Sequence, residues 1–377
     1  MANIMDYLNW RNDVTMQVDP FNEVDNLILS EIAYSNLDGI VPSPESRKKI
    51  SIQEASRLFF ERHDLSELST DKNGATANAP LFLKKASETR RFQKTKLFAY
   101  VNEIDEETEI QFSAVSFLLP DHSIYIAFRG TDHTLVGWQE DFNMSYLDAT
   151  PGQKQAVSYI NRIGRFTFRK IRVGGHSKGG NFAVYGSAFS DPKVQKKIRD
   201  VWSNDGPGFN EAIASLQKFK SILPKVHSIV PEHSIVGMIM ENAYHHKIVK
   251  SNATGLLQHD PTSWQVSGNQ FAEAEKLSDQ SLIFDETLRR WLDGLNSDTR
   301  KEFIAILFQS LAYGGKTTTD EVELSKPKTY ANMLAVIRTL PPEKQRLFGG
   351  VLAKLAKSWG SIMIDNLKRK WTGQDKE

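Results

Sequence analysis

The chain contains no cysteine among its 377 residues, which excludes disulfide bridges, thiolate metal sites and a cysteine nucleophile. It also lacks an excess of charge of one sign, because 47 Lys and Arg against 46 Asp and Glu leave a net charge of +1. Such a balance carries no overall signature of a nucleic-acid binder, so we expect no nucleic-acid partner. No apolar run reaches the roughly eighteen residues that a membrane-spanning helix needs. We expect no transmembrane segment, which leaves peripheral contact with a membrane open.

The amino-terminal residues, from Met1 to Asp6, lack the charged and apolar regions of a secretory signal peptide. Together with the absence of cysteine, this predicts a cytoplasmic location. Hydrophobic residues make up 40% and charged residues 25% of the chain, which is the composition of an ordinary globular protein.

The first hundred residues show mostly helical patterns. Apolar residues in 21–34 recur at helical spacing, and 52–62 resembles a second helix. The segment 70–79 is rich in Thr, Asn, Gly and Ala and predicts a loop.

From residue 112 the pattern changes to short strands. Apolar and branched residues in 112–119 and 123–128 flank a turn signal, which predicts a hairpin. Further buried strands are predicted at 170–174, 200–203 and 225–230, with helices at 153–168 and 178–189. Strands that alternate with helices indicate a mostly parallel sheet flanked by helices.

Beyond about residue 280 the strand patterns stop. Leu288, Trp291, Leu292 and Leu295 fall at the spacing of one helix face, and 347–367 predicts a last amphipathic helix. We therefore expect a principal domain over residues 1–280, with a largely helical part over 1–100, and a helical C-terminal region over 281–377.

The most informative motif is Gly175-x-Ser177-x-Gly179, with an apolar strand before it and a helix of small residues after it. A strand that turns this sharply into a helix holds the central serine in a strained backbone, and side chains at the flanking glycines would collide. The turn presents the Ser177 hydroxyl beside a helix start, where free N–H groups favour a developing negative charge. The motif predicts a nucleophilic serine on an α/β-hydrolase fold.

An oxyanion needs two hydrogen-bond donors in this kind of site. The backbone N–H of Lys178 is one candidate, and Thr131, at the end of the strand at 123–128, could supply its N–H and its hydroxyl. Asp141 lies on the next predicted helix. It could pair with Arg129 and hold this loop, which is a structural role.

A serine nucleophile also needs a histidine base that follows it in the chain. Of the five candidates, His227 lies within a predicted strand, and His245 and His246 lie in a predicted surface helix. His259 follows the last core strand in a loop, where the base of this fold belongs. We favour His259, with His233 next.

The carboxylate that orients the base has two candidates. Glu232 follows the later strand, which is the usual position of the acid. Asp205 follows the strand after the nucleophile, in a rigid Asp-Gly-Pro-Gly turn that could fix a carboxylate. Asp260 is next to the favoured histidine but is poorly placed to reach its ring.

The sequence resembles class 3, fungal-type lipases in two segments. One is Phe128-Arg129-Gly130-Thr131 with Trp138 and Asp141, and the other is the Gly-His-Ser-Lys-Gly-Gly stretch at 175–180. The resemblance implies that Ser177 is the nucleophile and that Thr131 helps to form the oxyanion hole. It implies no metal or organic cofactor.

Residues 3–270 resemble more closely a bacterial family of lipase-like proteins, the Mbeg-type domain of unknown function. The resemblance rests on the opening motifs at 6–11 and 20–25, on 204–209, on 231–237 and on His259-Asp260. Class 3 lipases carry their acid before a Val-Pro pair, a position that here looks like Ser234. This departure favours Asp205 narrowly as the acid, with Glu232 as the alternative.

These observations predict a serine hydrolase that cleaves a carboxylic ester, of a lipid or of a small molecule, through Ser177, His259 and Asp205. A catalytically weak binding or scaffold protein on the same fold is the alternative, because a fold does not secure a function. A thioesterase or peptidase would use the same residues.

Overall fold

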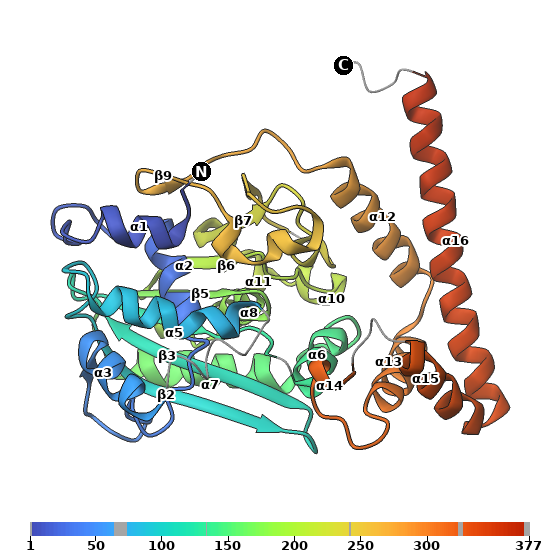
Figure 1. Ribbon diagram of the computed structural model, residues 1–377, viewed down its shortest axis with the longest axis horizontal. Helices are drawn as coiled ribbons and strands as arrows, with labels where there is room; N and C mark the ends of the chain where they lie inside the picture. Colours follow the sequence, from blue (N-terminus) through green and yellow to red (C-terminus); the bar gives the residue numbers. More distant parts are fainter. Residues whose placement is uncertain (1, 64–73, 133, 241–242, 323–326, 373–377) are drawn as a thin grey trace.

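The computed structural model describes residues 2–63, 74–132, 134–240, 243–322 and 327–372 (Figure 1). Eight of its strands form one sheet in the order β1-β2-β3-β4-β5-β6-β7-β8. These strands are β1 (Ile50–Ser51), β2 (Lys96–Asp105), β3 (Ile110–Leu118), β4 (Ile124–Phe128), β5 (Ile171–His176), β6 (Ile198–Asn204), β7 (Val226–Pro231) and β8 (His246–Val249). β9 (Val266–Ser267) and β10 (Gln270–Phe271) form a separate pair.

The sheet is antiparallel from β1 to β4 and parallel from β4 to β8. The predicted hairpin is therefore β3–β4, and it leads into the parallel part. With helices on both faces and further helices after residue 278, this confirms the predicted α/β-hydrolase fold with a helical C-terminal region.

The helices up to the end of the sheet are α1 (Ile4–Trp10), α2 (Glu23–Ile32), α3 (Ile52–Arg62), α5 (Gly74–Ser87), α6 (Leu135–Asn143), α7 (Pro151–Arg165), α8 (Lys178–Phe189), α9 (Pro192–Gln195), α10 (Glu211–Ala214) and α11 (Gln217–Lys220). The later ones are α12 (Asp279–Asp293), α13 (Ser297–Leu311), α14 (Thr319–Val322), α15 (Pro327–Thr339) and α16 (Pro342–Thr372).

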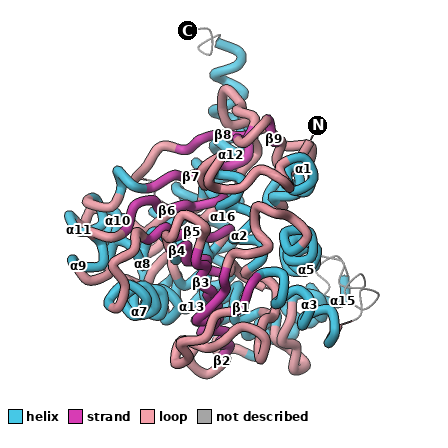
Figure 2. The backbone as a smooth tube through the Cα atoms, turned by 90° about the vertical axis from the view of Figure 1, so that its left-hand side faces the viewer, coloured by secondary structure: helices cyan, strands magenta, loops and turns pink. Residues whose placement is uncertain are grey.

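The strand order explains how the helices divide between the two faces. The parallel strands advance in one direction, and right-handed crossovers in one direction place their helices on the same face. Figure 2 shows α7 to α11 on one side of the sheet and α1, α3 and α5 on the other. The face that the crossovers leave open is thus covered by the N-terminal helices.

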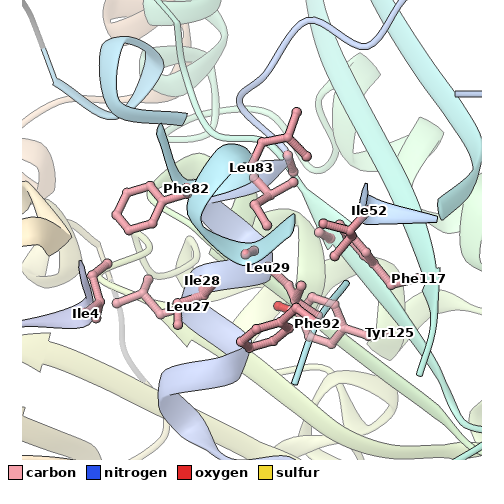
Figure 3. Close-up of a cluster of buried hydrophobic side chains, with 14 of the residues drawn as sticks. Ile4, Leu27, Ile28, Leu29, Ile52, Phe82, Leu83, Phe92, Phe117 and Tyr125 are labelled. Carbon is pink, nitrogen blue, oxygen red and sulfur yellow. The ribbon is translucent and has the colours of Figure 1, made fainter. Parts of the chain in front are cut away.

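β4 shows the two faces residue by residue. Tyr125 and Ala127 belong to the hydrophobic cluster under the N-terminal helices, whereas Ile124, Ile126 and Phe128 belong to the cluster under α7 and α8. This is the two-residue period of a strand that is buried on both faces. Figure 3 shows the first cluster, in which side chains of α1, α2 and α5 meet those of β3 and β4.

The C-terminal helices bury a hydrophobic cluster of their own, to which Trp291, Phe303 and Phe348 contribute. Leu135 of α6 belongs to the same cluster, and the Phe142 ring lies 5.6 Å from that of Phe308. The C-terminal helices therefore pack against α6, and we retain a boundary near residue 280 as a proposal. In the described part of the chain, no helix combines the length and the apolar character needed to cross a membrane.

Two expectations for the N-terminal part are wrong. Residues 74–79, predicted as a loop, form the first half of α5, while 70–73 lie outside the described residues. The turn-like composition of this segment is overridden because Phe82 and Leu83, further along the same helix, are buried in the sheet cluster. The long strand β2 was also missed, because the apolar character of its first half does not continue through the Asn, Glu and Asp residues of its second half.

Candidate active site

Ser177 lies between β5 and α8, at the carboxyl edge of the sheet, with a φ of 57° and a ψ of −133°. A positive φ is costly for a residue with a side chain, and such strain persists only where the surroundings impose it. The flanking glycines allow the turn: a Cβ on Gly175 would lie 2.3 Å from the Gly179 carbonyl, and one on Gly179 would lie 2.1 Å from the Phe128 carbonyl oxygen. The predicted collision across the turn is confirmed.

The loop after β4 runs directly beside this turn. A Cβ on Gly130 would lie 3.0 Å from the Cβ of Ser177 and 2.6 Å from the carbonyl oxygen of His176. Thr131, the next residue, is thereby brought to the serine. The backbone N–H groups of Thr131 and Lys178 have no hydrogen-bond partner among the described residues. Two unpaired donors thus flank the strained serine.

The side chains of this loop pair differently from the expectation. The Thr131 hydroxyl donates to the carboxylate of Asp141, while Arg129 pairs with Asp132 at 3.3 Å. The predicted Arg129–Asp141 pair is therefore wrong, because Asp132 is three residues from Arg129 on the same loop. Burial raises the pKa of Asp141 to about 6. Asp141 still ties the loop to α6, through the threonine instead of the arginine.

The side chain of Lys178 points into the core and is fully buried. Its Nζ lies 3.2 Å from Oε2 of Glu140, which is also fully buried, and it donates to the side-chain oxygen of Gln111. Glu140 also accepts the backbone N–H groups of Gln111 at 3.2 Å and of Gly152 at 2.7 Å. This buried ion pair ties the first turn of α8 to α6 and β3.

Asp205 follows β6 and is fully buried, with a φ of 47°. Its Oδ2 lies 2.7 Å from Nδ1 of His259. Because a carboxylate only accepts, Nδ1 carries the proton, and Nε2 of a neutral His259 is left as an acceptor. The structure therefore brings together the favoured acid and the favoured base.

The other oxygen of Asp205 is held from the loop after β7. Its Oδ1 accepts the hydroxyl of Ser234 at 2.5 Å and the backbone N–H of Gly237 at 3.1 Å. Ser234 occupies the position at which the lipase pattern carries its acid. A hydroxyl there hydrogen-bonds a carboxylate that comes from one strand earlier.

His176, the residue before Ser177, contacts His259. The two imidazole rings lie 4.7 Å apart, and Nε2 of His176 donates to the carbonyl oxygen of His259 at 3.0 Å. Among the described residues, no hydrogen bond joins the hydroxyl of Ser177 to the ring of His259. Catalytic hydrogen bonds in unliganded sites are often long and tighten only when substrate is bound.

The remaining acid candidates do not reach the base. Asp260 caps the short turn at 261–263, where its Oδ1 accepts from the backbone and hydroxyl of Thr262. The side chain of Glu232 has no hydrogen-bond or ion-pair partner among the described residues.

The remaining histidines lie elsewhere. His233 accepts from the side-chain amide of Gln258 at 2.8 Å, and His227 lies in β7, where it is half exposed. His246 is wrongly predicted as surface helix, since it begins β8 and its Nδ1 lies 2.8 Å from the hydroxyl of Ser228. His245 precedes that strand and is exposed.

A buried pair of side chains that was not predicted from the sequence lies behind the site. Oε1 of Glu31, on α2, lies 3.1 Å from Nδ1 of His176, and both side chains are almost completely buried. Burial lowers the pKa of His176, but the carboxylates of Glu31 and Asp205, with the hydrogen bond to the His259 carbonyl, together raise that pKa overall. A signal was present, because Glu31 follows Leu27 and Ile28 at helical spacing and so interrupts an apolar face.

Within the described ranges, no group of three or more His, Asp or Glu side chains is arranged to hold a metal ion. The expectation that no cofactor is needed stays a prediction.

The model of the Mbeg1-like family matches residues 86–309, more than half of the chain. The chain belongs to the Mbeg1-like family. None of the curated proteins compared with it matches significantly. Among solved structures, the crystal structure of M37 lipase is similar at 16% identity over 56% of this chain and 68% of that one, with a TM-score of 0.34.

Two further lipase structures show a similar level of likeness to this Mbeg1-like chain. The Rhizomucor miehei lipase propeptide complex is 13% identical over 63% of this chain and 79% of that one, with a TM-score of 0.34. The Lip2 lipase from Yarrowia lipolytica is 18% identical over 48% of this chain and 71% of that one, with a TM-score of 0.28.

Proposed function

We propose that this Mbeg1-like protein is a serine hydrolase that cleaves a carboxylic ester through an acyl-enzyme, with Ser177 as nucleophile, His259 as base and Asp205 as the orienting acid. The observation that carries the proposal is the 2.7 Å contact between His259 Nδ1 and Asp205 Oδ2, at the same sheet edge as the strained serine. This contact supports the proposal because a ring that donates from Nδ1 to Asp205 keeps Nε2 free to accept the proton of a serine.

The reaction begins when Oγ of Ser177 attacks the ester carbonyl carbon and Nε2 of His259 takes the hydroxyl proton. The carbonyl oxygen becomes negative and accepts hydrogen bonds from the N–H groups of Thr131 and Lys178. As the tetrahedral intermediate collapses, His259 gives its proton to the leaving alcohol. Water then attacks the acyl-enzyme with the same histidine as base and frees the acid. Asp205 stabilises the imidazolium without taking its proton.

The second candidate function is ligand binding, by a protein that has the same fold but is catalytically weak. The observation that favours it is the missing hydrogen bond between Ser177 and His259 in the described residues. If the His259 loop did not move closer when substrate bound, the serine would remain an alcohol of ordinary, low reactivity.

A fluorophosphonate probe distinguishes these two candidates, because it phosphonylates only an activated serine. We expect stoichiometric labelling of the native chain, which Ser177→Ala and His259→Ala abolish. Absence of labelling in protein that circular dichroism shows to be folded would instead support the binding function. Esters of increasing acyl length, thioesters and peptide amides, tested next on native enzyme that has not been treated with the probe, would separate an esterase or lipase from a thioesterase or peptidase.

A further inference from the structure

The loop between α7 and β5 carries the two most exposed large hydrophobic side chains in the described part of the chain. Phe166 is 89% exposed and Phe168 is 103% exposed. Exposing one aromatic ring almost completely is unusual in a globular domain, and two such rings, separated by a single residue in one loop, indicate a binding partner. Neither ring has a polar atom, so the partner must offer an apolar environment.

Cationic side chains surround the two rings, and most of them lack a matching carboxylate, although Arg165, next to Phe166, pairs with Asp191 at 2.9 Å. Nζ of Lys197 donates to the carbonyl of Thr167 at 2.7 Å and lies 6.0 Å from the centre of the Phe168 ring, and Arg169 donates to the carbonyl of His122 at 2.9 Å. Carbonyl partners leave the charge of these cations uncompensated. Among the described residues, no carboxylate lies within ion-pair distance of Arg169, Lys170, Lys193, Lys196 or Lys197.

The neighbouring helix α9 adds its lysines to the same region. Val194 packs against Gly164, where a Cβ would lie 2.3 Å from it, so α9 adjoins the last turn of α7. Lys193 lies on this helix, Lys196 directly follows it, and both are exposed. The pKa of Lys225 is lowered, by burial first and then by the positive charge of Lys170. Positive charge is therefore concentrated here, although the whole chain is nearly neutral.

We propose that this surface, the Phe166/Phe168 loop with its surrounding lysines and arginines, docks the protein on an anionic lipid bilayer. The two rings would enter the boundary between headgroups and acyl chains, and the cations would contact the lipid phosphates. Apolar rings at the tip of a cationic patch suit such an interface, since anionic lipids attract basic residues near a bilayer surface. A second copy of the chain is a poor partner, because its own cations would meet these in a symmetric contact.

The position of the loop separates docking from the proposed chemistry. The loop enters β5 at its amino end, whereas Ser177 leaves β5 at its carboxyl end. A strand of six residues spans about 20 Å at about 3.3 Å per residue. The protein would thus contact the bilayer at the edge of the sheet opposite Ser177. Binding to lipid therefore does not require hydrolytic activity.

The test is co-sedimentation of the full chain with vesicles of phosphatidylcholine alone and with vesicles that also contain phosphatidylserine. We expect binding to the anionic vesicles, lost as salt rises. The double variant Phe166→Ser/Phe168→Ser and the double variant Arg169→Gln/Lys170→Gln should each weaken it about tenfold or more. Val18→Ser is the matched control, since Val18 is 78% exposed outside this surface, and its binding should not change.

The labelling rate of Ser177 by the fluorophosphonate should be the same in all of these variants, so a failure of the proposed hydrolase function would not affect this test. Equal binding to both kinds of vesicle, or binding unchanged in both double variants, would overturn the proposal. So would a native chain that ignores vesicles but binds an oligonucleotide, or that self-associates through these residues in sedimentation velocity.

Discussion

Oδ2 of Asp205 lies 2.7 Å from Nδ1 of His259. Asp205 follows β6, the strand next to β5, which leads into Ser177. Because the acid comes from the end of β6, the loop after β7 is free to hold it. Ser234 and Gly237 both donate to its second oxygen. Three groups from two loops thus fix one carboxylate that has no access to water. Such a buried, fully hydrogen-bonded carboxylate can orient a histidine without rearranging during a reaction.

Replacing Asp205 by Asn should reduce kcat about a thousandfold or more, in line with the loss of the orienting acid in other triads. The amide would offer Nδ2 or Oδ1 to His259 and so favour the wrong tautomer of the ring. The measurement is turnover of a p-nitrophenyl ester, together with the fluorophosphonate labelling rate. Glu232→Gln is the control, and its activity should stay within a few fold of the native value. A reversed order of the two variants would move the acid to Glu232.

Gly237→Ala should impair the site without touching any proposed catalytic side chain. Its Cβ would lie 2.4 Å from Oδ1 of Asp205 and 2.8 Å from the hydroxyl of Ser234, so the carboxylate has to shift away from His259. We expect a loss of about a hundredfold in kcat, and a loss of about 1–3 kcal/mol in the free energy of unfolding from overpacking.

The matched control for this variant is Gly349→Ala. Gly349 lies on α16, and a Cβ there would meet no heavy atom within 4 Å. Removing a glycine from a helix interior should raise the free energy of unfolding by about 0.5–1 kcal/mol, with no effect on turnover. If the Gly237→Ala and Gly349→Ala variants were equally active, the position of the Asp205 carboxylate could not be important for turnover.

The sequence alone was sufficient to predict the parts of the candidate site that depend on local chain geometry. The turn at Ser177 is set by glycines two residues to either side, and α8 spans the predicted 178–189. The loop of His259 was expected after the predicted strand at 225–230, and the structure adds β8 between that strand and the loop. These features need only neighbours along the chain, which a motif and its spacing record.

The parts that were missed or misassigned depend on contacts distant in sequence. Glu31 meets His176 across more than a hundred residues, and the side chain of Lys178 reaches Glu140 on another helix. The base contacts Asp205 and not Glu232 because of the way three loops meet in the folded chain. No pattern of neighbouring residues predicts how these loops meet. The cytoplasmic location, the ester substrate and the alternatives to it stay predictions.

Lys178→Met should destabilise the fold by more than the loss of its hydrogen bonds alone. It leaves the fully buried carboxylate of Glu140 without its cation, and breaking a buried pair in this way costs about 3–5 kcal/mol. The double variant Lys178→Met/Glu140→Gln removes both charges and should recover part of that loss, because Gln can still accept from the backbone amides. Urea unfolding of the native, single and double variants measures the difference. A double variant no more stable than the single one would show that the charge of Glu140 is not the cause.

Asp141 should make the stability of the protein fall as the pH rises through the weakly acidic range. Burial raises the pKa of this carboxyl to about 6 in the folded chain, whereas its ordinary value is 3.8. The folded state therefore holds a proton that the unfolded chain has lost. The stability that this proton supplies is complete below the ordinary value and is lost as the pH passes about 6. Asp141→Asn removes the charge and keeps an acceptor for the Thr131 hydroxyl.

We expect the free energy of unfolding of Asp141→Asn, relative to the native chain, to increase between about pH 4 and about pH 7, by at most about 3 kcal/mol. The partial exposure of this residue reduces the gain below that limit. Urea titrations at several pH values in this range measure it. Asp148→Asn removes the same charge from an exposed position and should show no such increase. A flat difference for Asp141→Asn as well would mean that the carboxylate next to Thr131 is ionised throughout, and that its negative charge faces the proposed oxyanion hole at neutral and acidic pH alike.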